Sequence, residues 1–286
     1  MRKGISFICA VHGIDKFAYL EKLIKSIILE KKIDKQLIIV DQNEGSDLED
    51  FLKFNFTFKK KNFDLCYLKS EKGLSKARNK GLEIADRNII CFPDDDCEYP
   101  EGLFKKVERF FIENLEFQML ITGVRETNKG YMLAFTGTEG HRELKYNDVF
   151  NACCSISIFH LNRFEVRFDE SLGLGAQYKS CEDYDYVVSL MKQKVKVYFS
   201  DRYHVLHPDN LSLPKVKLIN KIKENSLGHG VYFRKHFDVL WMSVFKEIFG
   251  QLFLSVFYLL NSEKRNLYYA SFRVRFTSFV RYKYKN

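Results

Sequence analysis

The chain has 286 residues, 46% of them apolar, which is enough to bury one sizeable α/β core together with a small helical appendage. Its net charge of +9 favours anionic partners such as nucleotide phosphates, acidic lipid headgroups or nucleic acid, without choosing among them. Seven cysteines without a CxxC pair argue against a disulfide framework and against a zinc site. The apolar stretch at residues 5–11 is followed by no small-residue cleavage pattern, so we expect no signal peptide and a cytoplasmic location.

Apolar runs of strand length alternate with helical periodicity in the first third of the chain. Strands are predicted at residues 5–10, 36–40, 65–68 and 88–92. One helix is predicted from an apolar stripe within residues 20–28, and another from a stripe within residues 74–85. This βαβ alternation predicts an open, mostly parallel sheet flanked by helices, in which ligands bind outside the carboxyl ends of the strands.

The alternation continues beyond residue 100 with less regular spacing. We predict a helix at 103–111, strands at 117–124 and 153–159, a loop with Gly173 and Gly175, a helix with its apolar side at 184–191, and a half-exposed strand at 195–199. The pattern changes near Pro208 and Pro214. We therefore expect an α/β domain over residues 1–210 and a helical, basic region over residues 211–286.

Carboxylates follow two of the predicted strands at their carboxyl ends. Asp41 follows residues 37–40, and Asp94, Asp95 and Asp96 follow residues 89–92. Three adjacent aspartates repel one another unless a cation or solvent compensates them, and a hard divalent ion with oxygen ligands is the natural compensator. The alternative is a solvated turn or a helix N-cap. The position at a strand end, where ligands are expected, favours a metal site.

Two longer segments resemble a known enzyme family. Residues 72–100, KGLSKARNKGLEIADRNIICFPDDDCEYP, resemble the middle of the family 2 glycosyltransferases with their DXD-type motif. Residues 181–208, CEDYDYVVSLMKQKVKVYFSDRYHVLHP, resemble the family's ED motif and the strand after it. The resemblance covers roughly residues 4–210. It implies a GT-A fold and inverting transfer from a nucleotide-diphosphate sugar, usually a UDP-sugar, with Mn²⁺ or Mg²⁺ as cofactor.

The resemblance also implies roles for individual residues. Donor contacts fall on Ala10, His12, Asp41, Gly73, Arg78 and Asp94. Metal ligands fall on Asp95, Asp96 and His207, with His204 as the alternative histidine. A shift of one residue in the motif would make Asp96 the principal ligand in place of Asp95. Asp183 matches the general base, with Glu182 beside it, and both acids are expected at a helix N-terminus. Gly173 and Gly175 would let a loop lie close to the sugars, or are plain turn glycines.

The C-terminal region combines apolar and basic residues. Its longest apolar run, Ile248 to Leu260, is shorter than the roughly 17–25 residues that cross a bilayer, so we expect it not to span one. The basic residues after position 261 are Lys264, Arg265, Arg273, Arg275, Arg281, Lys283 and Lys285, against the single acid Glu263. We expect this region to attach to the anionic inner face of a cytoplasmic membrane. The alternative is a helical cap on the first domain or on a second copy, which would make a homodimer.

The function expected from these features is transfer of a sugar to a hydroxyl of a glycan or lipid-linked acceptor in cell-surface polysaccharide synthesis. A nucleotidyltransferase acting on a sugar phosphate is one alternative, but it would carry a Gly-rich basic loop after the first strand, and residues 10–18 hold only Gly13 and Lys16. A non-enzymatic membrane-surface binding protein is the other. We expect no nucleic-acid partner, because the basic residues come without a motif of that class.

Overall fold

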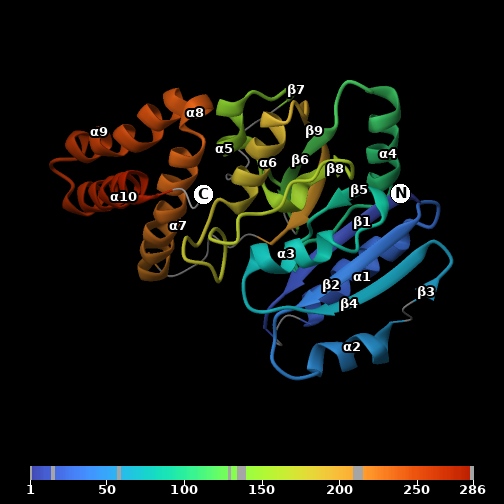
Figure 1. Ribbon diagram of the computed structural model, residues 1–286. Helices are drawn as coiled ribbons and strands as arrows, with labels where there is room; N and C mark the ends of the chain where they lie inside the picture. Colours follow the sequence, from blue (N-terminus) through green and yellow to red (C-terminus); the bar gives the residue numbers. More distant parts are fainter. Residues whose placement is uncertain are drawn as a thin grey trace.

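The computed structural model describes residues 2–13, 17–56, 59–127, 130–133, 140–208 and 215–283 (Figure 1). The strands are β1 (Arg2–Val11), β2 (Lys35–Asp41), β3 (Lys59–Lys60), β4 (Phe63–Lys69), β5 (Arg87–Cys91), β6 (Met119–Glu126), β7 (His141–Glu143), β8 (Ile158–Leu161) and β9 (Val197–His207). The helices are α1 (Phe17–Leu29), α2 (Asp47–Asn55), α3 (Leu74–Leu82), α4 (Leu103–Glu113), α5 (Val149–Ala152), α6 (Glu182–Lys192), α7 (Lys215–Lys235), α8 (Phe237–Val244), α9 (Gly250–Phe257) and α10 (Ser262–Arg281).

Within these residues the strands form one nine-stranded sheet in the order β3-β4-β2-β1-β5-β8-β6-β9-β7. Strands β4, β2, β1 and β5 run parallel to one another. Strand β8 lies antiparallel between β5 and β6, and β6 pairs in parallel with β9. The short edge strands β3 and β7 are antiparallel to their neighbours. The main strands therefore point one way, apart from β8, and the predicted helix-flanked, mostly parallel sheet is confirmed.

The apolar residues from which strands and helices were predicted are buried on the two faces of the sheet. All seven residues of β2 are buried, as expected for a central parallel strand. The stripe of α1 buries Leu20, Leu23, Ile24 and Ile27. Helix α3 lies against β1 so closely that a Cβ on Gly81 would stand 2.3 Å from Cγ2 of Ile8. Glycine at this position therefore brings α3, which carries Arg78, close to the sheet.

One predicted strand is wrong in its position. Residues 155–157 form a 3₁₀ turn, η3 (Ser155–Ser157), and the strand β8 begins only at Ile158. The hydroxyl of Ser157 donates to the carbonyl of Cys154 at 2.8 Å, and the backbone N–H of Ser157 donates to the same carbonyl at 3.0 Å. Serine side chains that bond the local backbone compete with a strand ladder. This turn places Ser155 next to Arg78.

The C-terminal helices form a group beside α6, at the opposite end of the molecule from α2 and β3 (Figure 1). Close packing between α7 and α10 depends on Gly230, since a Cβ there would lie 2.2 Å from the carbonyl oxygen of Arg275. The predicted boundary near residue 210 lies outside the described residues. One helix, Phe237–Phe257, is long and apolar enough to cross a membrane by length and composition alone. The expectation that this region is too short was wrong, because α8 and the π-helical turn η5 (Phe245–Phe249) extend the apolar run towards the N-terminus.

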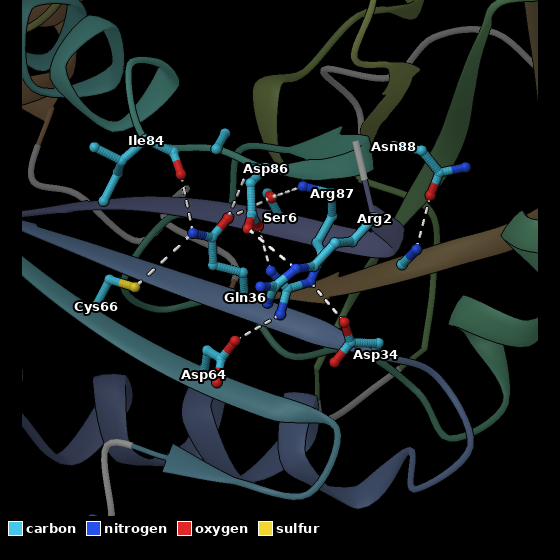
Figure 2. A network of polar contacts seen from close by, with 12 residues as sticks. Arg2, Ser6, Asp34, Gln36, Asp64, Cys66, Ile84, Asp86, Arg87 and Asn88 are labelled. Carbon is cyan, nitrogen blue, oxygen red and sulfur yellow. Dashed lines mark hydrogen bonds and ion pairs between the residues drawn. The ribbon is translucent and has the colours of Figure 1, made fainter.

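A buried arginine joins the amino ends of four strands (Figure 2). The Arg87 side chain, only 2% exposed, bonds Asp34 at 2.7 Å, Asp64 at 2.6 Å and also Asp86. Asp34 precedes β2, Asp64 lies in β4, and the hydroxyl of Ser6 in β1 accepts the backbone N–H of Arg87 at 3.1 Å. These contacts fix the frame of the sheet at the edge opposite the strand ends that carry the predicted site.

We predict that Arg87→Met lowers the free energy of unfolding by about 2 kcal/mol. This is less than the loss expected for a fully buried ion pair, because the three aspartates reach solvent. Urea unfolding followed by circular dichroism measures the change. Arg2→Met is the matched control, since Arg2 is 70% exposed and its ion pair with Asp86 is 3.9 Å long. Equal stability of the two variants would contradict a structural role for the Arg87 network.

Candidate functional site

A pocket of about 500 Å³ lies at the carboxyl ends of β1, β5 and β9. Its wall is formed by Ala10, His12, Gln42, Lys72, Leu74, Arg78, Asp94, Asp95, Asp96, Cys154, Ser155, Leu174, Gly175, Glu182, Asp183 and His207. The predicted donor-binding, metal-binding and catalytic residues therefore gather in one place, apart from Asp41 and Gly73, which are not among these lining residues. The five carboxylates in the wall outnumber the two permanent cations, Lys72 and Arg78. The pocket therefore has an excess of negative charge.

The acidic loop after β5 meets the end of β9. Glu98 and Leu206 exchange two backbone hydrogen bonds of 2.9 Å, which hold the loop against the last residues of the strand. As a result, one ligand atom each from Asp94, Asp96 and His207 lie within 4.8 Å of one another. His204 lies on the same strand but is not among the pocket-lining residues that the structure describes.

The orientation of the His207 ring suits a metal ligand. Its Nδ1 lies 2.7 Å from the carbonyl of Pro208, and its Nε2 lies 3.3 Å from Oδ1 of Asp96. The carbonyl accepts a hydrogen bond from Nδ1–H, and in that neutral tautomer the lone pair of Nε2 is directed towards the acidic loop. Burial opposes a charged ring, yet the hydrogen bond and the charge of Asp96 raise the pKa of His207. Two carboxylates and one imidazole fit Mn²⁺ or Mg²⁺ as a donor set.

The predicted ligand Asp95 has a different environment from its neighbours. Its side chain lines the same pocket but is only 4% exposed. The group of ligand atoms around His207 contains Asp94 and Asp96, which corresponds to the alternative of a one-residue shift in the motif. That Asp95 is the principal metal ligand and that Asp94 contacts the ribose both stay predictions.

Arg78 joins the acidic loop to α6 beneath the pocket. The guanidinium is 1% exposed, and its Nη2 donates to Asp94 at 3.1 Å and to the hydroxyl of Ser155 at 2.9 Å. Its Nη1 lies 3.6 Å from Oε1 of Glu182. The rings of Phe92 and Phe168 lie 5.9 Å and 5.4 Å from the guanidinium carbon, within the range of cation–π interactions. Arg78 thus holds carboxylates in place, and its predicted contact with donor phosphates stays a prediction.

Glu182 and Asp183 form the first turn of α6, as predicted. Cys181 begins the helix in a left-handed conformation, with φ of 71°, and both acids then project into the pocket wall. Burial raises the pKa of both carboxyl groups above their ordinary values, while the positive charge of Arg78 opposes the rise in each. For Glu182 the negative charge of Asp183 adds to the rise. A carboxylate with a raised pKa is better suited to accept a proton than an exposed one.

The predicted glycine loop approaches this pair of acids. Gly173 has φ of +96°, and a Cβ on it would lie 3.1 Å from Cδ of Glu182. Gly175, with φ of +83°, lines the pocket and lies against Gly73, whose Cα would be 3.1 Å from an added Cβ. Glycine is therefore required here both for backbone conformation and for close approach.

Asp41 and Gly73, which do not line the pocket, form hydrogen bonds with neighbouring protein groups. The Asp41 carboxylate is fully buried and accepts from Tyr67 at 2.7 Å, from Lys69 at 2.6 Å and from the side chain of Asn43 at 2.8 Å. Gly73 donates its N–H to Oε1 of Gln42 at 2.8 Å at the start of α3. A role for either residue in donor binding stays a prediction.

Sequence reasoning missed several lining residues. Gln42 and Lys72 are sequence neighbours of the predicted residues Asp41 and Gly73. They follow a predicted strand and precede a predicted helix, so their positions could have identified them as lining residues. Ser155 and Cys154 gave no such signal, because the segment was predicted as a strand.

Comparisons with known proteins agree with the observed fold. No curated protein matches the chain. Crystal structures of S. aureus TarS share its architecture. The complex of TarS 1–349 with UDP has a TM-score of 0.56 and 14% identity over 99% of this chain and 93% of that one. The complex with UDP-GlcNAc has a TM-score of 0.53 at 14% identity, with the same coverage.

The architecture is therefore the GT-A glycosyltransferase fold, as the sequence resemblance implied. The sequence model of glycosyl transferase family 2 matches residues 8–167, more than half of the chain. The chain belongs to glycosyl transferase family 2.

We predict that Mn²⁺ or Mg²⁺ raises the melting temperature by ~5 °C at a hundredfold excess over Kd, because only the folded chain assembles the ligands. His207→Ala should lose the shift, and His204→Ala, on the same strand, should keep it. Asparagine variants of Asp94, Asp95 and Asp96, measured in the same way, rank the three aspartates as ligands. An undiminished shift in His207→Ala would exclude this histidine from the metal site.

Proposed function

We propose that the protein transfers a sugar from a UDP-sugar to an acceptor hydroxyl, with inversion at the anomeric carbon and with Mn²⁺ or Mg²⁺ bound in the pocket. The observation that carries the proposal is the meeting of Asp94, Asp96 and His207 with Glu182 and Asp183 in one pocket of a family 2 chain. Cleavage of a sugar–diphosphate bond needs compensation of negative charge on one side and a proton acceptor on the other.

The donor side of the reaction belongs to the acidic loop and its neighbours. Asp94, Asp96 and His207 would hold the divalent ion, which when bound offsets the charge that develops on the leaving diphosphate. Lys72 is exposed at the same pocket and is suited to contact phosphate oxygens. The crystal structures of TarS with UDP and with UDP-GlcNAc support a uridine nucleotide as the donor class.

The acceptor side belongs to the N-terminus of α6. Asp183 would take the proton of the acceptor hydroxyl while the oxygen attacks the sugar from the face opposite the diphosphate. Glu182 is held by Arg78 and stands beside it, so it would orient the base or the acceptor. We further propose, from the family membership, that the acceptor is a hydroxyl of a glycan or of a lipid-linked glycan in cell-surface polysaccharide synthesis.

We predict that Asp183→Asn lowers the transfer rate by about 10²–10⁴, the contribution typical of a positioned general base. A thermal-shift screen of nucleotide sugars with metal first identifies the donor, and release of UDP with or without acceptor then reports turnover. The variant should keep the metal-dependent thermal shift with UDP, which shows that its pocket is intact. Turnover equal to that of the unmodified protein would place the base elsewhere.

We predict an acid limb in the pH profile that lies above the range of an ordinary aspartate. The base acts only when deprotonated, and burial raises the pKa of Asp183, so turnover should fall as the pH drops through that raised pKa. Because Arg78 lowers this pKa, Arg78→Gln should move the acid limb to higher pH. The profiles are compared at saturating metal, and an unmoved or oppositely moved limb would contradict the electrostatic link.

A further inference from the structure

A row of exposed aromatic side chains follows the outer side of the helix from Phe237 to Phe257. The row consists of Phe237, Trp241, Phe245, Phe249, Phe253 and Phe257, each between 40% and 70% exposed. A step of four residues slightly exceeds one α-helical turn of about 3.6 residues, so such a row would drift round a regular helix. The wider π-turn at Phe245–Phe249 offsets part of this drift.

The neighbouring helix α10 extends this row into a surface. Phe249 lies 6.2 Å from the ring of Phe272 and 6.2 Å from that of Phe276. Phe276 and Tyr269 of α10 are 40% and 52% exposed. We call the six residues of the row together with Tyr269 and Phe276 the aromatic face. Contiguous exposed apolar area of this kind marks an interaction surface.

The other side of the same helix is fixed to the protein. Leu240, Val244 and Ile248 are buried in the core that also contains α6 residues. Asp238 pairs with Lys192 at 2.8 Å, and Glu247 pairs with Arg275 at 3.6 Å. A helix that crossed a bilayer would lose its contacts with the core and with α6. The geometry therefore favours a helix that lies on a membrane, although its length and composition would permit it to span one.

Exposed cations lie on the same two helices as the aromatic face. Lys246 is 76% exposed on the same helix, and Lys264, Arg273 and Arg281 are exposed on α10. Arg275, which the sequence counted with the basic residues of the tail, is 8% exposed and holds Glu247, so it does not contribute to this surface. Lys285 lies outside the described residues. Aromatic and basic side chains on one face suit a lipid interface with anionic headgroups.

We propose that the aromatic face binds the surface of an anionic bilayer, as at the inner face of a cytoplasmic membrane, with the helix Phe237–Phe257 lying in the plane of the interface. This proposal concerns binding alone and does not depend on the transfer reaction. Asp183→Asn should therefore bind vesicles as the unmodified protein does, whatever its activity.

The only tryptophan of the chain, Trp241, lies within the aromatic face and reports directly on its environment. Addition of vesicles containing phosphatidylglycerol should shift its emission to shorter wavelength, and lipids brominated near the headgroup should quench it more than lipids brominated near the chain end. Vesicles of phosphatidylcholine alone should bind more weakly. No shift with vesicles would overturn the proposal. A shift that follows protein concentration without lipid would overturn it in favour of a second copy.

Paired variants separate the aromatic and basic contributions. Phe253→Ser and Phe257→Ser should each weaken sedimentation with anionic vesicles by about tenfold, and Lys246→Gln with Arg273→Gln by about fivefold for each charge. Phe54→Ser and Lys105→Gln are the controls, because these residues are exposed on α2 and α4, away from the aromatic face. All of these positions are exposed, so unchanged melting temperatures are expected. Equal binding of the Phe253 and Phe54 variants would overturn the proposal.

Discussion

The pocket depends on one buried positive charge. Arg78 stands between Asp94 of the loop after β5 and Glu182 of α6, and it is enclosed by aromatic rings. Five carboxylates in one wall repel one another, and Arg78 offsets only part of that repulsion from beneath. A positive charge bound in the pocket can offset the remaining repulsion. The same excess of charge that makes Arg78 necessary therefore makes the pocket attractive to a divalent cation.

Charged residues gather at both ends of the parallel strands, but they have different surroundings at the two ends. At the amino edge, Arg87 bonds all three aspartates directly, and this network holds β1, β2, β4 and β5 together. At the carboxyl edge, five carboxylates line an open pocket together with the two permanent cations Lys72 and Arg78. The charged residues at the amino edge therefore stabilise the sheet, and those at the carboxyl edge line a pocket that a ligand can enter.

Periodicity was enough to predict β1, α1, β2 and α3, because their burial follows from regular spacing. It failed where local hydrogen bonds decide the backbone, as at Ser157 and the turn before β8. The position at a strand end predicted the acidic loop, and the apolar stripe that starts at Tyr184 predicted the N-terminus of α6. The environment of Asp41 could be known only from the register of the sheet. This register places Lys69 of β4 directly opposite Asp41, and the two side chains form an ion pair. The inward position of Arg275 depends on its partner Glu247 in another helix, which no spacing within α10 indicates.

The C-terminal helices are joined to α6 by buried ion pairs. Asp185 of α6 is 2% exposed and bonds Lys235 at 2.7 Å and His236 at 2.8 Å, at the junction of α7 and α8. Lys235 also bonds Asp169, which precedes the glycine loop, at 2.6 Å. Breaking such a buried network is costly, so α8 cannot move as a flexible tether. A surface bound through the aromatic face would therefore hold α6 and the glycine loop at a fixed height and orientation above it.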